Sequence, residues 1–402
     1  MIESGSKAYK KITLSLALGS FLVFCNLYLL QPMLPLLAKH FVVSETQINW
    51  VFAATTLTLA VSLVPWAVCS EIYGRRNVML IGLYALPAIG LCMSLTDSLI
   101  MLVLFRALLG LALAAFASVA VAYMAEELSE KAFSLAIGGY IAANSLGGIS
   151  GRIAGGMLAD LLSWEAAVLI MATLTLLGAV CLQLLLPKQK NFKPQKGMLR
   201  FHNRALVKHL QNQKLWFAML VGGLNFALFV NLYTVMGFRL VSAPHSLPIA
   251  LASLIFLCYL AGTVSSKLSG SWLLRHGAVS GMLLGSIISM MGMWLAYIDQ
   301  LPFMLAGLLL ISFGAFFTHT LAYGWVSRKA VQGKATATAL YLVHYYIGGS
   351  LGGFFLIYLW QHGGWAEVIA GGMMLYLLMF GLILKLKRTH QLDQIKTQPE
   401  AM

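Results

Sequence analysis

Two arginines lie inside apolar stretches of this chain, where a charge is costly. Arg106 stands in "LVLFRALLGLALAA" (102–115) and Arg152 in "SLGGISGRIAGGM" (145–157), and neither stretch contains an acid. A charge at the bilayer centre costs about 2.5–3.5 kcal/mol on insertion scales, so such arginines usually face a cavity or a bundle interior. Their planar fork of donors suits carboxylate, phosphate or sugar hydroxyls. We therefore expect solute contact or gating, with bonding to helix carbonyls as the structural alternative for Arg152.

The elements that must hold these arginines are membrane helices. The chain is 60% hydrophobic and 10% charged, against roughly 45–50% and 25% in soluble domains. Without the alternating pattern of a β-barrel, apolar runs of about 20 residues indicate helices that span a bilayer. We predict an all-α polytopic membrane protein with twelve transmembrane helices, at 13–37, 46–69, 77–96, 98–124, 133–158, 164–187, 215–239, 248–270, 278–298, 301–326, 335–360 and 365–386.

The net charge of +14 is a topology signal. When the 27 Lys and Arg are assigned to alternating loops, 23 fall on the side of the termini, two (Lys39 and Arg239) on the other side, and two inside spans. This is the positive-inside pattern, which predicts that both termini are cytoplasmic. The basic loops are expected to contact anionic lipid rather than nucleic acid.

The sequence also repeats itself. The stretch 140–164 aligns with 341–365 without a gap at an offset of 201, and the polar segment between the halves carries eight Lys or Arg and no acid. Because six spans are an even number, both copies have the same orientation, as in transporters built from parallel repeats. We predict an N-terminal half at 1–187, a basic cytoplasmic linker at 188–214, and a C-terminal half at 215–402.

Three motifs resemble those of the major facilitator superfamily. The loop "AVCSEIYGRRNVM" (67–79) resembles its G-x-L-x-D-x-x-G-R-R/K signature, with Glu71 at the usual aspartate and Gly74, Arg75 and Arg76 in place. The stretch 102–115 is similar to the fourth-span signature and has Arg106 at its arginine. The fifth span matches the antiporter signature G-x8-G-x3-G-P-x2-G-G, with Arg152 at its proline, through Gly138, Gly147, Gly151, Gly155 and Gly156.

The resemblance extends over essentially the whole chain and is nearest to the YnfM-type group of inner-membrane facilitators, related to drug and sugar efflux permeases. It implies alternating access, with spans 1, 4, 7 and 10 around a central cavity. The loop motif would form a gate, and the stripe of Gly147, Gly151 and Gly155 either a rocking contact or static packing. The expected substrate-binding or coupling residues are Asn26, Tyr28, Gln31, Arg106, Asn144, Arg152, Asn225, Asn231, Tyr233, His319, Tyr323 and His344.

Titratable groups in the membrane are few. All 13 acids lie in loops, tails or span ends, whereas many proton-driven facilitators carry a buried carboxylate. His319 and His344 are the candidates left for proton exchange near the ordinary histidine pKa of about 6.5, or they are hydrogen-bonded packing residues. With two arginines and no carboxylate, the cavity is expected to favour an anionic or a neutral, hydroxyl-rich solute.

These observations predict a secondary-active transporter that moves a small organic solute by proton-coupled efflux. The alternatives are an uptake symporter or facilitator of an organic anion or sugar, and a non-transporting membrane sensor or scaffold. Phosphate-cradling, zinc-protease and paired-carboxylate motifs are absent from the sequence, so we expect no enzyme, cofactor or metal. The expected setting is a monomer in a bacterial inner membrane.

Overall fold

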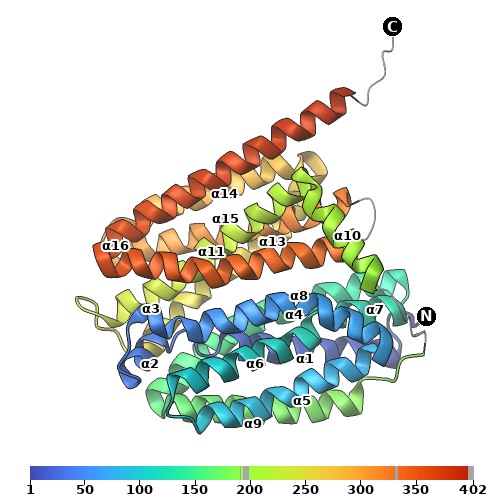
Figure 1. Ribbon diagram of the computed structural model, residues 1–402, viewed down its shortest axis with the longest axis horizontal. Helices are drawn as coiled ribbons and strands as arrows, with labels where there is room; N and C mark the ends of the chain where they lie inside the picture. The colour runs from blue at the N-terminus through green and yellow to red at the C-terminus, as the bar shows by residue number, and fades with distance from the viewer. Residues whose placement is uncertain (191, 193–198, 331–333, 397–402) are drawn as a thin grey trace. The chain divides into compact units, whose positions relative to one another are not determined.

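The computed structural model describes residues 1–190, 192, 199–330 and 334–396. Within these ranges the chain is almost entirely helical and contains no β-strand, so the predicted all-α class is confirmed (Figure 1). The first helices are α1 Lys7–Tyr28, α2 Leu34–His40, α3 Glu45–Ile48, α4 Trp50–Tyr73, α5 Arg75–Ser94, α6 Leu99–Ala117, α7 Ala120–Glu127, α8 Glu130–Leu161 and α9 Trp164–Leu185. The others are α10 Leu199–Gln211, α11 Gln213–Val241, α12 Ile249–Ala252, a 3-10 helix Ser253–Cys258, α13 Tyr259–Arg275, α14 Ala278–Ala296, α15 Leu301–Lys329 and α16 Lys334–Lys396.

Eleven helical segments of the described chain are long and apolar enough to cross a membrane. The last of them, Thr336–Thr389, has 54 residues and contains Gly364 at φ 64°. Glycine adopts a positive φ without the steric cost of a side chain, so the helix breaks there into two spans. The break lies between the predicted spans 335–360 and 365–386, and the twelve predicted spans are all present.

The first span differs from its prediction as one continuous run, 13–37. Helix α1 ends at Tyr28, turns follow, and α2 begins at Leu34. Pro32 and Pro35 lie in this stretch; proline lacks a backbone N–H and disfavours a helical conformation in the residue before it. A helix end inside an apolar layer leaves carbonyl oxygens that need donors.

The chain forms two compact units. Unit 1 contains Met1–Leu199 and Met236–Phe256, and unit 2 contains Arg200–Val235 and Leu257–Met402. The first boundary falls inside the predicted linker 188–214, part of which lies outside the described residues. The segment Met236–Phe256 groups with unit 1, although the repeat assigns it to the second half.

Glycines allow close helix packing within each unit. In unit 1, a Cβ on Gly151 would lie 2.6 Å from the Cα and carbonyl oxygen of Cys25 in α1. Gly147 of α8 meets the α1 backbone at Phe21, and Gly155 meets the backbone of Leu29, directly after the end of α1. In unit 2, Gly348 of α16 lies against the backbone of Gly223 in α11. The predicted stripe therefore brings two helix backbones together in each unit.

Candidate functional site

The broken first span positions Arg106. This α6 side chain is 1% exposed, and its Nη1 and Nη2 donate to the carbonyl oxygens of Asn26 (3.2 Å) and Leu27 (2.9 Å). Its Nε donates to the carbonyl of Val51, at 3.0 Å. Because α1 ends at Tyr28, carbonyls of its last turn lack intrahelical N–H partners, and a cation there also complements the helix dipole. Arg106 thus caps a helix end inside the apolar layer.

Arg152 reaches the same break from α8. Its Nε donates to Gln31 Oε1 at 2.7 Å and its Nη1 to the Gly148 carbonyl at 2.8 Å. Its Cζ lies 3.5 Å from the ring centroid of Tyr28 and 4.8 Å from that of Phe256. The side chain is 1% exposed, so it joins α1, α8 and the 3-10 helix rather than facing solvent.

Both membrane arginines therefore converge on residues 26–31. Their charges were predicted to line a cavity, whereas each guanidinium is engaged with buried protein groups. This geometry favours the structural alternative for Arg152 and gives Arg106 a capping role. Direct contact of either residue with a solute remains a prediction.

Three of the predicted asparagines, and Tyr233, connect helices. In unit 1, Asn26 Nδ2 donates to Thr175 Oγ1 of α9 at 2.8 Å, and Asn144 is half-buried on α8. In unit 2, Nδ2 of Asn225 and of Asn231 donates to carbonyl oxygens of α15 and α16, at 2.9 and 2.8 Å, and the hydroxyl of Tyr233 lies 2.6 Å from Ser312 Oγ. Polar side chains between membrane helices commonly serve as such ties.

Unit 2 also brings together an aromatic cluster, which we define as Phe226, His319, Tyr323, Tyr341, Tyr345 and Tyr346. His319 Nδ1 lies 3.0 Å from the hydroxyl oxygen of Tyr341. The predicted His319 and Tyr323 thus contact rings of α16 that the sequence analysis did not name. The run "YLVHYY" (341–346), with three tyrosines in six residues, was the available signal. His344 of the same helix donates from Nδ1 to its own Leu340 carbonyl, at 2.8 Å.

The loop motif folds into a polar hinge. Gly74, at φ 94°, separates α4 from α5. Arg75 donates from Nε and Nη2 to Glu126 Oε1, at 3.0 and 2.9 Å, whereas its Nη2 is 3.8 Å from the Glu71 carboxylate. Arg76 donates to carbonyl oxygens beside the end of α9. Glu71 was the acid predicted for the gate, whereas the shorter ion pair of Arg75 is with Glu126, which the sequence did not single out although the predicted topology places it on the same membrane side.

The profile of the Major Facilitator Superfamily matches residues 16–353. This chain belongs to the major facilitator superfamily. It is 32% identical over 385 residues to the uncharacterized MFS-type transporter YybF of Bacillus subtilis, covering 95% of this chain and 94% of the relative. It is 30% identical to the inner membrane transport protein YnfM of Escherichia coli, covering 95% and 91%. The predicted resemblance is therefore confirmed.

The fold of this facilitator agrees with that of solved transporters. It matches an inward-facing, unoccupied bacterial homologue of the human lysosomal transporter Spinster with a TM-score of 0.80 and 15% identity, over 99% of this chain and 100% of that one. The family and its relatives are transporters, not enzymes. The chain is accordingly a multi-pass membrane protein and a secondary transporter.

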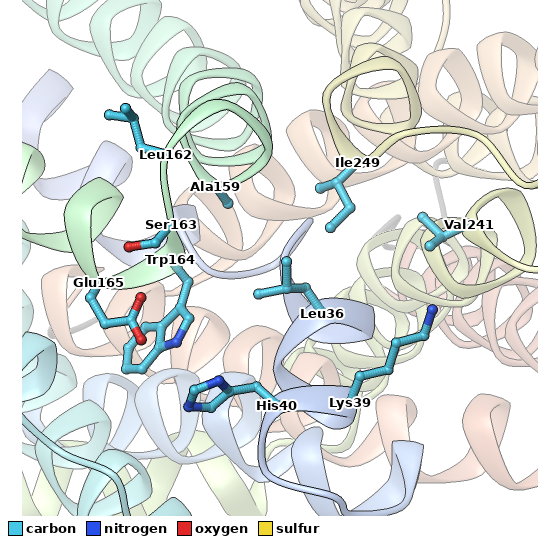
Figure 2. Close-up of a pocket in the computed structure, with 10 residues that line it drawn as sticks. All are labelled: Leu36, Lys39, His40, Ala159, Leu162, Ser163, Trp164, Glu165, Val241 and Ile249. Carbon is cyan, nitrogen blue, oxygen red and sulfur yellow. The ribbon is translucent and has the colours of Figure 1, made fainter.

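One cavity of this facilitator lies apart from every predicted site residue. It has a volume of about 640 Å³ and lies in unit 1, where α2 and the junction of α8 and α9 meet Val241 and Ile249. Figure 2 shows the side chain of Lys39 extending toward Val241, with His40 beside Trp164. The volume is in the usual range for ligand pockets. Among the described residues, no group of three or more His, Cys, Asp or Glu side chains could hold a metal ion.

Proposed function

We propose that this facilitator exports a small organic solute across the cytoplasmic membrane in exchange for protons, with both termini in the cytoplasm. The observation that supports this proposal is the contact of His319 with Tyr341, 3.0 Å from Nδ1 to the hydroxyl oxygen, inside an apolar span. No acid of the sequence lies in the middle of a predicted span. An imidazole can gain and lose a proton, and in this proposal His319 carries the proton that a carboxylate carries in many proton-driven facilitators.

The surroundings of His319 leave few other groups for this role. The aromatic cluster is built from three elements: α11 contributes Phe226, α15 contributes Tyr323, and α16 contributes Tyr341 and its neighbours. Tyrosine keeps its proton in the physiological range because its ordinary pKa is about 10. The remaining imidazole is His344 on α16, which is also half-buried.

The test is flux in proteoliposomes that contain a trapped pH-sensitive dye. A panel of organic solutes is added with and without an imposed pH gradient, and proton movement is recorded for the wild type and for His319→Gln, His344→Gln and the double variant. The control is His362→Gln, an exposed histidine on α16. We expect coupled proton movement in the wild type that is lost in the double variant and retained in the control.

Other outcomes contradict the proposal in different ways. Solute flux that is the same with and without the pH gradient indicates facilitated diffusion. Solute and protons that move in the same direction indicate uptake by symport. Binding without any flux indicates a sensor, and a pH profile that survives in the double variant removes the two histidines from the mechanism.

A further inference from the structure

The aromatic cluster has an ordered interior and a half-exposed side. Phe226, Tyr341 and Tyr346 are buried, whereas His319 and Tyr345 are half-buried and Tyr323 is 37% exposed. The rings of Phe226 and Tyr345 are stacked, with centroids 3.9 Å apart and planes 14° from parallel. Buried rings therefore fix the orientation of the more exposed ones.

The stack continues beyond this pair. Tyr341 and Tyr345 are 24° from parallel, and the His319 ring lies 4.4 Å from Tyr345 by centroids. Phe226 also contacts Tyr346 edge-on, at 5.7 Å. Aromatic rings favour offset-stacked and edge-to-face neighbours, so the half-exposed rings offer a stacking surface for a further flat ring.

The chemistry of the cluster selects among ligand classes. Its six side chains are one phenyl ring, four phenol rings whose hydroxyls can form hydrogen bonds, and one imidazole, with no carboxylate or ammonium group among them. A cation would also be attracted to ring faces, but a protonated His319 would repel it. An aliphatic anion would find no guanidinium or ammonium group among the six described side chains of the cluster, and the guanidinium groups of Arg106 and Arg152 are engaged within unit 1.

We propose that the solute is a planar aromatic or heteroaromatic molecule, uncharged at neutral pH, that stacks on Tyr345 and His319 and shares a hydrogen bond with the hydroxyl of Tyr323. This inference rests on the proposed function, since it identifies the class of solute for the same site. It differs from the anionic or hydroxyl-rich solute expected from the sequence, because the exposed surface is made of rings rather than arginines.

Binding of matched pairs of probes tests the inference on the purified full-length protein. The planar probes are 4-hydroxybenzamide, 7-hydroxycoumarin and adenine. The saturated twin is trans-4-hydroxycyclohexanecarboxamide, and tetraethylammonium is the cation. Affinity is read from the rise in melting temperature with ligand concentration. We expect at least one planar probe to bind about tenfold more tightly than both the twin and the cation, a difference of about 1.4 kcal/mol.

Variants of one helix provide the control. Tyr345→Leu should weaken binding of that planar probe about tenfold, while Tyr345→Phe keeps the ring and should stay within about threefold. Tyr358→Leu removes a tyrosine of α16 that is 55% exposed and lies outside the cluster, and it should change nothing. Equal binding of the planar probe and its twin, tighter binding of the cation, or equal losses in Tyr345→Leu and Tyr358→Leu would each overturn the inference.

The flux assay separates this inference from the proposed function. If protons are exchanged for a saturated or charged solute and no planar probe binds, the solute class is wrong and proton-coupled export stands. If planar probes bind with the expected dependence on Tyr345 but drive no proton movement, the binding site stands and the proposed function fails.

Discussion

Replacing Arg152 tests whether this intramembrane arginine is held by the protein or kept for a solute. Arg152→Ala removes a charged hydrogen bond to Gln31 Oε1, at 2.7 Å, one to the Gly148 carbonyl, and ring contacts with Tyr28 and Phe256. A hydrogen bond to a charged group contributes about 1.5–3 kcal/mol, and a desolvated cation–π contact contributes up to about 2 kcal/mol. The variant also leaves the buried amide of Gln31 without this donor.

We expect the free energy of unfolding to fall by about 3 kcal/mol. This is less than the sum of the individual contributions, because the Gly148 carbonyl also accepts a hydrogen bond within its own helix and such contributions are not additive. For domains of 150–250 residues, 1 kcal/mol corresponds to about 2–4 °C, so we expect the melting temperature of Arg152→Ala to fall by about 6–12 °C. Arg152→Lys should recover part of this loss, since it keeps the charge without the planar fork.

A double-mutant cycle isolates the bond to Gln31. Arg152→Met, which largely fills the space of the arginine stem, is combined with Gln31→Leu, and the stability of the four proteins is measured. We expect a coupling energy of about 1.5–3 kcal/mol. Arg152→Ala that melts normally yet binds its solute more than tenfold more weakly would refute the structural reasoning and restore the solute contact expected from the sequence.

Three further results are expected from the described contacts. Glu126→Gln should shift the populations of the conformational states at least as strongly as Glu71→Gln, as measured by labelling of single introduced cysteines, and should change the affinity for solute less than about threefold (below 1 kcal/mol). A larger shift in Glu71→Gln would show that Glu71, rather than Glu126, is the main acid of the gate. Gly151→Ala should lower the melting temperature, whereas Gly138→Ala should not, because nothing lies within 4 Å of its added Cβ. Both substitutions gain similar helix propensity, so equal effects on the melting temperature would exclude the contact of Gly151 with the α1 backbone. Arg106→Leu should lower the free energy of unfolding by about 3 kcal/mol or more, because two carbonyl oxygens at the end of α1 lose their hydrogen-bond donor. A variant that melts at the wild-type temperature would exclude Arg106 as a cap of α1.

Much of the architecture was predictable from the sequence, because membrane spans depend on local composition. Apolar runs of the right length, the even count and the repeat at an offset of 201 predicted the fold class, and the resemblance of three motifs predicted the family. The prediction was wrong about span 1 as a continuous helix. The prolines at positions 32 and 35 were visible in "QPMLP", but the effect of two prolines on a helix end depends on whether neighbouring helices can supply donors for the freed carbonyls.

The site was less predictable, because it depends on which partner each polar side chain finds. The sequence identifies Arg106, Arg152 and His319 as unusual in apolar stretches, yet it gives no way to distinguish a guanidinium facing a solute from one bonded to a carbonyl. Glu126 and Tyr345 were missed for the same reason. Each is ordinary in its own segment and acquires a role through a contact 51 or 119 residues away along the chain.

The break in span 1 explains why both membrane arginines are tolerated. A continuous helix over 13–37 would bond the carbonyls of Asn26 and Leu27 internally, and Arg106 would then be a buried charge without these acceptors. With α1 ending at Tyr28, those oxygens accept from Arg106, and the turn that follows places Gln31 where Arg152 can donate to it. Each feature would be costly in an apolar layer by itself, whereas together the carbonyls and the guanidinium groups satisfy one another. The arginines are therefore best understood as part of the first span, and the search for the solute belongs at the rings of unit 2.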